Sequence, residues 1–189
     1  MEAFLTSTAL VAVAEIGDKT QLLAILLATR FRRPLPIVAG IFAATIANHF
    51  LAALLGHTLA GMLESPAFRI AIALGFIGMG LWTLVPDKID EEMKTPRTSG
   101  IFLTTLIAFF LVEMGDKTQI ATVALGARFA NVYAVTAGTT FGMMIANVPA
   151  VYLGEALIAR VKLGVVRAIA AALFIAIGLW LLGASLHWW

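Results

Sequence analysis

The chain has 189 residues, of which 61% are hydrophobic and only 13% are charged, and its mean hydropathy is +0.96. A water-soluble domain of this size needs more polar surface, so the composition indicates a protein that folds in a lipid bilayer. The formal net charge of +2 is typical of basic topology signals and does not indicate nucleic-acid binding. Because the chain has no cysteine, disulfides, thiolate metal sites and cysteine nucleophiles are excluded.

Six hydrophobic segments predict an all-α integral membrane protein with six transmembrane helices, since one span needs about 20 apolar residues. They lie near 4–29, 36–56, 67–85, 101–127, 133–157 and 165–184. The chain begins without the basic region of a signal peptide, so we expect the first segment to be an uncleaved span. A polar cytoplasmic linker at 87–100 is expected to join a first three-helix unit, 1–86, to a second, 101–189.

The two units repeat one another. Glu15-Ile16-Gly17-Asp18-Lys19-Thr20-Gln21 recurs 98 residues later as Glu113-Met114-Gly115-Asp116-Lys117-Thr118-Gln119. The same offset aligns Gly80-Leu81-Trp82 with Gly178-Leu179-Trp180, and Ile46-Ala47-Asn48 matches Ile145-Ala146-Asn147 after a slip of one residue. Because each unit holds an odd number of spans, the second must enter the membrane from the opposite side. The sequence therefore predicts two inverted three-helix repeats, an arrangement common in secondary transporters.

Basic residues predict the orientation. If both termini lie outside, two arginines fall on the exterior loops, Arg69 and Arg128. Nine basic residues then fall on the cytoplasmic side: Arg30, Arg32, Arg33, Lys88, Lys94, Arg97, Arg160, Lys162 and Arg167. This bias follows the positive-inside rule, and Trp188-Trp189 fits an aromatic anchor at the exterior interface.

The repeated motif places acids where a membrane protein normally has none. On a continuous helix, Glu15 and Asp18 would lie about 60° apart on one face near the middle of the first span. The second copy, Glu113 and Asp116, has the same spacing in the fourth span, and inversion would bring both copies together. Small-residue stripes beside them, such as Gly40 and Gly138, are predicted to be close-packing faces between helices.

The cost of burying these charges favours an ion site. Each ionised group at a helix centre costs about 2.5–3.5 kcal/mol, so four carboxylates and two lysines cost roughly 15–20 kcal/mol before pairing. Lys19 and Lys117 neutralise two carboxylates, and the remaining charge of −2 is one that a divalent cation would cancel. Carboxylate oxygens suit hard ions such as Mn²⁺, Ca²⁺ and Mg²⁺. The alternative is that the acids and lysines only hold the helices together, which does not require two surplus acids.

Other residues are candidates for a supporting role. Thr20, Gln21, Thr118 and Gln119 could add oxygen ligands, although both glutamines point away on an ideal helix. Gly17 and Gly115 could permit close helix approach or local unwinding that exposes carbonyl groups to an ion. Asn48 and Asn147 occupy matching places and could be ligands or could hydrogen-bond across helices. His49 and His57 have no counterparts in the other repeat, and although His49 adjoins Asn48 we expect a packing or interfacial role for it.

The paired E-φ-G-D-[KR]-[TS] motifs resemble those of the Gdt-type cation/proton exchanger family, which includes bacterial manganese exporters. Both copies, Glu15 to Thr20 and Glu113 to Thr118, fit that pattern without departure. The resemblance implies export of Mn²⁺, or of Ca²⁺, from the cytoplasm in exchange for protons, with the motif acids as ligands. It also implies no cofactor beyond the transported ion, and a multi-pass location in the bacterial inner membrane with lipid as the surrounding partner.

Three other functions fit parts of the pattern. A passive divalent-cation channel would use the same acids without coupling to protons, and an exporter of basic amino acids would bind an ammonium group there. An intramembrane aspartyl protease would be an enzyme with two aspartates on neighbouring helices, one within G-x-G-D. In this chain Glu15 and Glu113 stand where the first glycine of that motif would be, so a transporter is favoured over an enzyme.

Overall fold

The computed structural model describes residues 1–85, 100–154 and 163–186, and within these ranges all regular structure is helical. The helices are α1 (Glu2–Glu15), α2 (Lys19–Phe31), α3 (Pro34–Leu59), η1 (Ala60–Glu64), α4 (Pro66–Thr83), α5 (Ile101–Glu113), α6 (Lys117–Phe129), α7 (Val132–Leu153) and α9 (Leu163–Ser185). The predicted linker at 87–100, apart from Gly100, and the predicted anchor Trp188-Trp189 lie outside the described residues.

Four helical stretches are long and apolar enough to cross a membrane: Pro34–Met62, Pro66–Thr83, Val132–Leu153 and Gly164–Ser185. They correspond to four of the six predicted spans, so the chain is a multi-pass membrane protein. The other two predicted segments, 4–29 and 101–127, are not continuous helices. Each is divided at the acidic motif into two short helices, α1 with α2 and α5 with α6.

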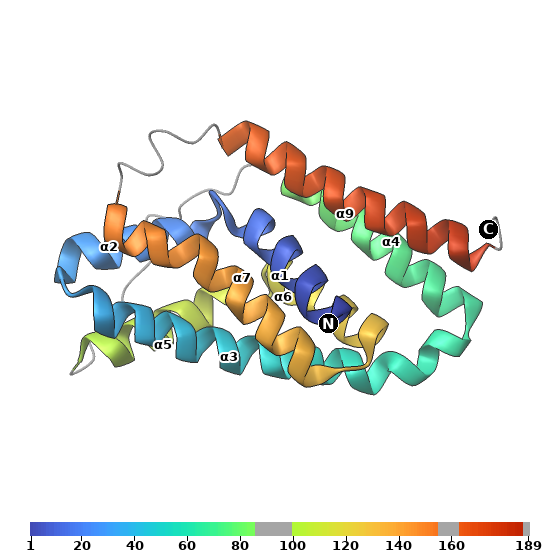
Figure 1. Ribbon diagram of the computed structural model, residues 1–189, viewed down its shortest axis with the longest axis horizontal. Helices are drawn as coiled ribbons and strands as arrows, with labels where there is room; N and C mark the ends of the chain where they lie inside the picture. Colours follow the sequence, from blue (N-terminus) through green and yellow to red (C-terminus); the bar gives the residue numbers. More distant parts are fainter. Residues whose placement is uncertain (86–99, 155–162, 187–189) are drawn as a thin grey trace.

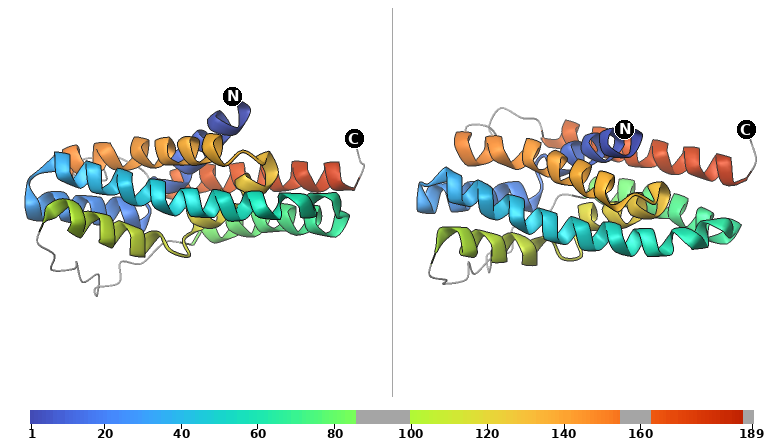
Figure 2. Two further views of the ribbon diagram at one scale, coloured as in Figure 1. Left: turned by 90° about the horizontal axis from the view of Figure 1, so that it is seen from below. Right: turned by 60° about the horizontal axis from the view of Figure 1, so that its bottom comes forward.

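The helices lie roughly along one long axis, and the pair α4 and α9 packs along one side of the remaining bundle (Figure 1). In that bundle α7 packs against α1 and α2, while α3 packs against α5 and α6, and α3 and α7 also contact each other (Figure 2). Apolar residues from both repeats fill the interior, including Leu23, Ile41 and Phe109 in one cluster and Phe76 and Phe174 in another. The motif-bearing helices are thus enclosed by α3 and α7.

Close helix contacts occur at corresponding glycines of the two repeats. A Cβ atom at Gly40 would lie 2.8 Å from the carbonyl oxygen of Phe102, and one at Gly138 would lie 2.5 Å from that of Phe4. Similarly, a Cβ at Gly80 would meet the carbonyl of Ala171 at 2.9 Å. These distances are shorter than real Cβ contacts, so only glycine allows the helices to approach this closely. The prediction that Gly40 and Gly138 lie on packing faces is confirmed.

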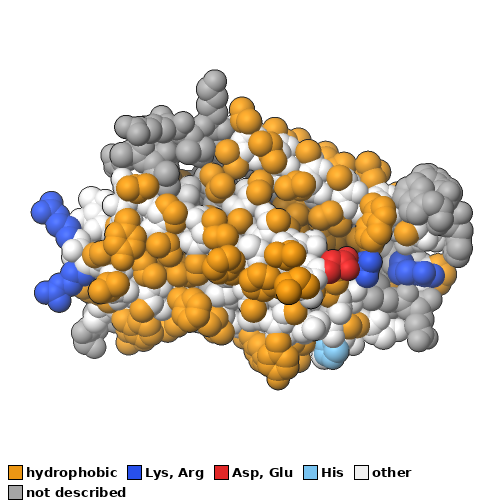
Figure 3. Space-filling model, viewed as in Figure 1, with side chains coloured by type: hydrophobic (Ala, Val, Ile, Leu, Met, Phe, Trp, Pro, Cys, Tyr) orange, Lys and Arg blue, Asp and Glu red, His pale blue; other side chains and the backbone are white. Residues whose placement is uncertain are grey.

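The outer surface is apolar along most of its length. Hydrophobic side chains cover the middle of the face in Figure 3, and lysine and arginine side chains lie towards its two ends. Leu5, Leu51 and Leu81 are each more than half exposed, as expected of side chains that face lipid rather than water. The end of α9 and the turn before α4 lie towards one end, whereas the turn between α2 and α3 lies at the other (Figure 1).

Candidate metal centre

The two helix breaks place the repeated motifs at the centre of the molecule. α1 ends at Glu15 and α2 starts after Asp18, while α5 ends at Glu113 and α6 starts after Asp116. The breaks depend on glycine, because Gly17 has φ of 83° and Gly115 has φ of 77°, in the left-handed region that other residues rarely adopt. The prediction of local unwinding at both glycines is confirmed, and the expectation that Glu15 and Asp18 share one face of a continuous helix is wrong.

The glutamines of the motif stabilise the breaks. Gln21 Oε1 accepts a hydrogen bond from Gly17 N at 2.8 Å, and Gln119 Oε1 accepts one from Gly115 N at 2.6 Å. Gln21 Nε2 also donates to the carbonyl oxygen of Ala146 on α7 at 3.0 Å. Both glutamine oxygens are thus engaged with the backbone at the breaks, so these side chains hold the unwound segments in place. An ideal-helix projection could not reveal this role.

Three carboxylates converge between the halves. One oxygen each from Glu15, Glu113 and Asp116 lie within 4.8 Å of one another, and all three residues are buried. Asp18, the fourth predicted ligand, is also buried but is not a member of this group. The structure therefore brings together three of the four predicted acids and places Asp18 in an ion pair beside them.

Each motif lysine pairs with the aspartate of the other motif. Lys19 Nζ lies 2.9 Å from Asp116 Oδ1, and Lys117 Nζ lies 3.5 Å from Asp18 Oδ1. These two contacts cross between the halves, so they neutralise both aspartates and join the repeats. The two motif acids that are left without a lysine partner are therefore Glu15 and Glu113.

Glu15 and Glu113 are fully buried, and most of their oxygens lack partners. Within the described residues, neither carboxylate oxygen of Glu15 has a hydrogen-bond partner, and the same is true of Glu113 Oε1. Glu113 Oε2 accepts a hydrogen bond from Thr118 Oγ1 at 3.2 Å. Buried carboxylate oxygens are normally satisfied by donors or by a cation, so this arrangement makes the glutamates candidate cation ligands.

The helix termini add to the negative potential at this point. Both glutamates end a helix, at the terminus where the backbone carbonyls carry the partial negative charge of the helix dipole. A carboxylate is disfavoured there, whereas a cation is stabilised by the carboxylate and the carbonyls together. Asp18 and Asp116, by contrast, occupy the N-cap positions of α2 and α6, where a negative charge is favourable.

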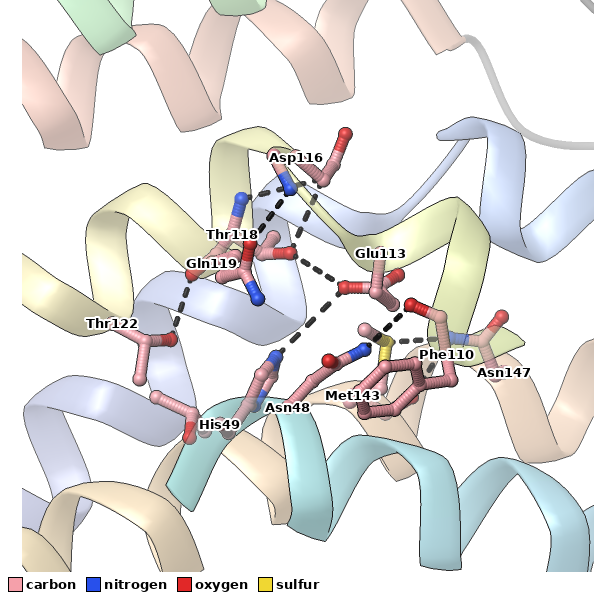
Figure 4. A network of polar contacts seen from close by, with 12 residues as sticks. Asn48, His49, Phe110, Glu113, Asp116, Thr118, Gln119, Thr122, Met143 and Asn147 are labelled. Carbon is pink, nitrogen blue, oxygen red and sulfur yellow. Dashed lines mark hydrogen bonds and ion pairs between the residues drawn. The ribbon is translucent and has the colours of Figure 1, made fainter. Parts of the chain in front are cut away.

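The remaining polar side chains of the motif differ in their surroundings. Thr118 Oγ1 also lies 3.2 Å from Asp116 Oδ2, so this threonine links two of the converging acids (Figure 4). Its counterpart Thr20 is buried, and its hydroxyl has no hydrogen-bond partner in the part of the chain that the structure describes. Asp116 Oδ2 additionally accepts from Thr118 N at 3.3 Å, which fixes the start of α6.

The two asparagines lie beside the site on α3 and α7. Asn48 Nδ2 donates to the carbonyl oxygen of Phe110 at 3.0 Å, and Asn147 Nδ2 donates to that of Met143 at 3.1 Å (Figure 4). The Asn48 bond crosses from α3 to α5, as expected of an asparagine that joins helices. Asn147 Oδ1 is buried without a hydrogen-bond partner among the described residues, so it is available to an ion or a water molecule.

His49 lies closer to the site than the sequence analysis expected. Its Nε2 is 3.9 Å from Glu113 Oε2, and its ring points towards that carboxylate (Figure 4). The residue is fully buried in α3, one position after Asn48. Its adjacency to Asn48 was the only signal in the sequence, and the absence of a histidine in the other repeat hid its importance. His57, on the same helix, is exposed.

Comparison with known proteins identifies the family of the chain. The family model described as "Divalent cation/proton antiporter GDT1" matches residues 3–91 and 101–188, one stretch in each half of the chain. The chain belongs to the GDT1 family. As a GDT1 protein it is a transporter of divalent cations and not an enzyme, so the protease alternative is excluded and the metal is a substrate rather than a cofactor.

Curated relatives include bacterial and plant GDT1 proteins. A Vibrio cholerae protein named "Putative manganese exporter" is 47% identical over 180 residues, covering 95% of this chain and 90% of that protein. The GDT1-like protein sll0615 of Synechocystis is 31% identical over the whole chain and 98% of its own length. GDT1-like protein 5 of Arabidopsis thaliana is 27% identical over 95% of this chain and 94% of its own length. No solved structure matches the chain.

Proposed function

We propose that this protein exports Mn²⁺ from the cytoplasm in exchange for protons, with Glu15, Glu113 and Asp116 as ligands of the transported ion. The observation that carries the proposal is the pairing of both lysines with the two aspartates, which leaves two buried glutamates without a basic partner on either motif. Their combined charge of −2 matches one divalent cation. Asp18 holds Lys117 in place, and Thr118 orients the two acids of the second motif.

Mn²⁺ is favoured over other divalent ions for two reasons. A ligand set of carboxylate oxygens suits Mn²⁺, Ca²⁺ and Mg²⁺ and does not suit softer ions that prefer thiolates. The Vibrio cholerae relative, which covers nearly the whole chain, is named for manganese. Ca²⁺ is the second candidate substrate, because the three converging carboxylates would also serve that ion.

The transport cycle is proposed to use two inverted three-span halves, with α1 and α2 as one broken span and α5 and α6 as another. Equivalent contacts support this: α1 packs on α7 as α5 packs on α3, and Gly138 approaches Phe4 as Gly40 approaches Phe102. Broken helices whose ends meet at mid-membrane are typical binding elements of secondary transporters. We therefore place the ion site near the centre of the bilayer, between the halves.

The correspondence between the halves fails at the pair α4 and α9, and this supports alternating access. α9 packs on α1, but the corresponding pair in the other half, α4 with α5, is not a packed pair among the described helices. Likewise α4 packs on α6, but its counterpart, α9 with α2, is not a packed pair among them. Inverted repeats in two different surroundings are the structural basis of a two-state carrier. In the second state the pair would contact α2 and α5, and the site would open to the other side.

Exchange for protons follows from the charge of the empty site. After the ion has left, two unneutralised glutamates would have to change sides within a low-dielectric interior, which is costly. Uptake of protons from the exterior removes that charge and returns the carrier. The proposed location is the inner membrane, with both termini on the exterior side as the basic residues predict.

The experiment is uptake of Mn²⁺ and Ca²⁺ into inside-out vesicles, with and without a pH gradient that is acidic inside. We expect the gradient to accelerate Mn²⁺ uptake and the variants Glu15→Gln and Glu113→Gln to abolish it. Glu2→Gln changes an exposed glutamate of α1 outside the site and serves as the matched control. Saturable flux that ignores the gradient would favour a passive carrier or channel, and competition by lysine would favour a basic amino-acid exporter.

A further inference from the structure

His49 is a buried side chain whose polar atoms have no visible function in the fold. The residue is 0% exposed, and neither Nδ1 nor Nε2 has a hydrogen-bond partner among the residues that the structure describes. By contrast, side-chain amides around the site form hydrogen bonds to backbone groups, as Gln21, Gln119 and Asn48 do. A buried imidazole with two unsatisfied nitrogens is unfavourable unless an ion or a water molecule contacts those nitrogens.

The two repeats differ at the position of His49. The matching segments Ile46-Ala47-Asn48 and Ile145-Ala146-Asn147 are followed by His49 in one half and by Val148 in the other. Val148 is partly buried, whereas His49 is fully buried. The imidazole therefore adds something to one half of the site that the symmetric arrangement lacks.

The position of the ring indicates what it adds. Nε2 lies 3.9 Å from Glu113 Oε2, and the ring is directed at this carboxylate from α3 (Figure 4). Two ligands on opposite sides of one ion, with bonds of about 2.1 Å, lie about 4.2 Å apart. The carboxylate oxygen of Glu113 and the imidazole nitrogen are thus close enough to bind the same ion, although His49 is not one of the three residues whose ligand atoms all lie within 4.8 Å of one another.

We propose that His49 Nε2 is a ligand of the transported ion and makes the site selective for transition-metal ions over Ca²⁺ and Mg²⁺. Imidazole nitrogen binds first-row transition metals well, whereas Ca²⁺ and Mg²⁺ strongly prefer oxygen. Carboxylates alone would not separate Mn²⁺ from these two abundant ions. This inference rests on the proposed function, because it assumes that the carboxylate group is the transport site.

Electron paramagnetic resonance of Mn²⁺ bound to the purified protein tests the ligand directly. Pulsed spectra should contain the coupling of a directly bound imidazole nitrogen, and this coupling should disappear in His49→Val. The double variant His57→Val/His187→Val, which removes both other histidines, should retain the nitrogen coupling. This result would assign the coupling to His49 even if His49→Val does not fold. Bound Mn²⁺ without nitrogen coupling would overturn the role of His49 and leave the proposed function intact, whereas absence of Mn²⁺ binding would overturn both.

Competition between Mn²⁺ and Ca²⁺ for binding and for vesicle transport tests the selectivity. In His49→Val and His49→Gln we expect the preference for Mn²⁺ over Ca²⁺ to fall by roughly tenfold, with Ca²⁺ affinity nearly unchanged. His57→Val alters an exposed histidine of the same helix and should leave the preference as it is. Equal weakening of both ions in the His49 variants would identify a packing role and reject the proposal.

Discussion

Lys19 Nζ lies 2.9 Å from Asp116 Oδ1, so the lysine of the first motif neutralises the aspartate of the second. The aspartate next to it in sequence, Asp18, instead contacts Lys117. This exchange of partners explains why the motif occurs twice. One copy alone would lack the partner for its lysine and for its aspartate, and the two glutamates would not be left facing each other.

The first prediction concerns this exchange. A double-mutant cycle between Lys19→Met and Asp116→Asn should give a coupling free energy of about 1 kcal/mol, because the pair is partly shielded from solvent. The matched cycle between Lys19→Met and Asp18→Asn, within one motif, should give a clearly smaller value. Thermal unfolding in detergent measures both cycles. Equal coupling to the two aspartates would contradict the pairing across the halves.

The second prediction concerns the two glutamates as one ion site. Glu15→Gln and Glu113→Gln should each reduce Mn²⁺ transport to background, and the double variant should be no worse than either single one. The reason is that a divalent ion needs both charges, so removal of one already prevents binding. Vesicle uptake of Mn²⁺ measures the effect, with membrane insertion checked separately. Losses that multiply in the double variant would mean that the motifs bind ions independently.

The third prediction concerns the helix breaks. Gly115→Ala should destabilise the protein by about 1–2 kcal/mol and impair transport, because alanine is strained in the left-handed conformation found there. No neighbouring atom would contact the added Cβ, so the effect would be conformational and not steric. Gly75→Ala in α4 is the control, since its Cβ would also meet no atom and its backbone is helical. Equal effects in thermal unfolding would contradict this account.

The acids and the glycines of the candidate site could be selected from the sequence alone. Charged residues inside apolar segments are costly wherever they point, so Glu15, Asp18, Glu113 and Asp116 could be selected without coordinates. The duplication then implied that the two copies meet. Both inferences depend on composition and spacing, which are properties of the chain alone.

The glycines of the motif indicated that the helices could unwind there, but the exact helix ends and the partners of the lysines could not be predicted in the same way. The segments around Ile16 and Met114 are apolar on both sides of the motif, so hydrophobicity gives no sign that the helix ends there. Whether Lys19 pairs with Asp18 or with Asp116 depends on how the two halves face each other. The same is true of His49, whose contact with Glu113 joins α3 to α5 and leaves no trace in either repeat.

The fourth prediction concerns membrane topology. The chain has no cysteine, so a single introduced cysteine can be labelled without background. In intact cells an impermeant reagent should label Ser65→Cys, between η1 and α4, and should not label Ser99→Cys before membranes are opened. The basis is the excess of lysine and arginine in the loops assigned to the cytoplasm. Labelling of Ser99→Cys in intact cells, without labelling of Ser65→Cys, would reverse the proposed orientation and the direction of transport.

The last prediction concerns the exchange of metal for protons. Carboxylates bind a metal only when they are deprotonated, so protons and Mn²⁺ must compete for Glu15 and Glu113 if these residues carry both. Binding of Mn²⁺ should then release protons, and by linkage the affinity for Mn²⁺ should fall as the pH is lowered. Calorimetry of Mn²⁺ binding in buffers of different ionisation enthalpy counts the released protons, and Glu113→Gln should reduce the count together with the affinity. The Lys117–Asp18 pair lies outside the converging acids, so Asp18→Asn should alter the proton count less than Glu113→Gln does. A count of zero across the neutral range, with vesicle transport that ignores the pH gradient, would reject exchange and leave a carrier that moves the ion alone.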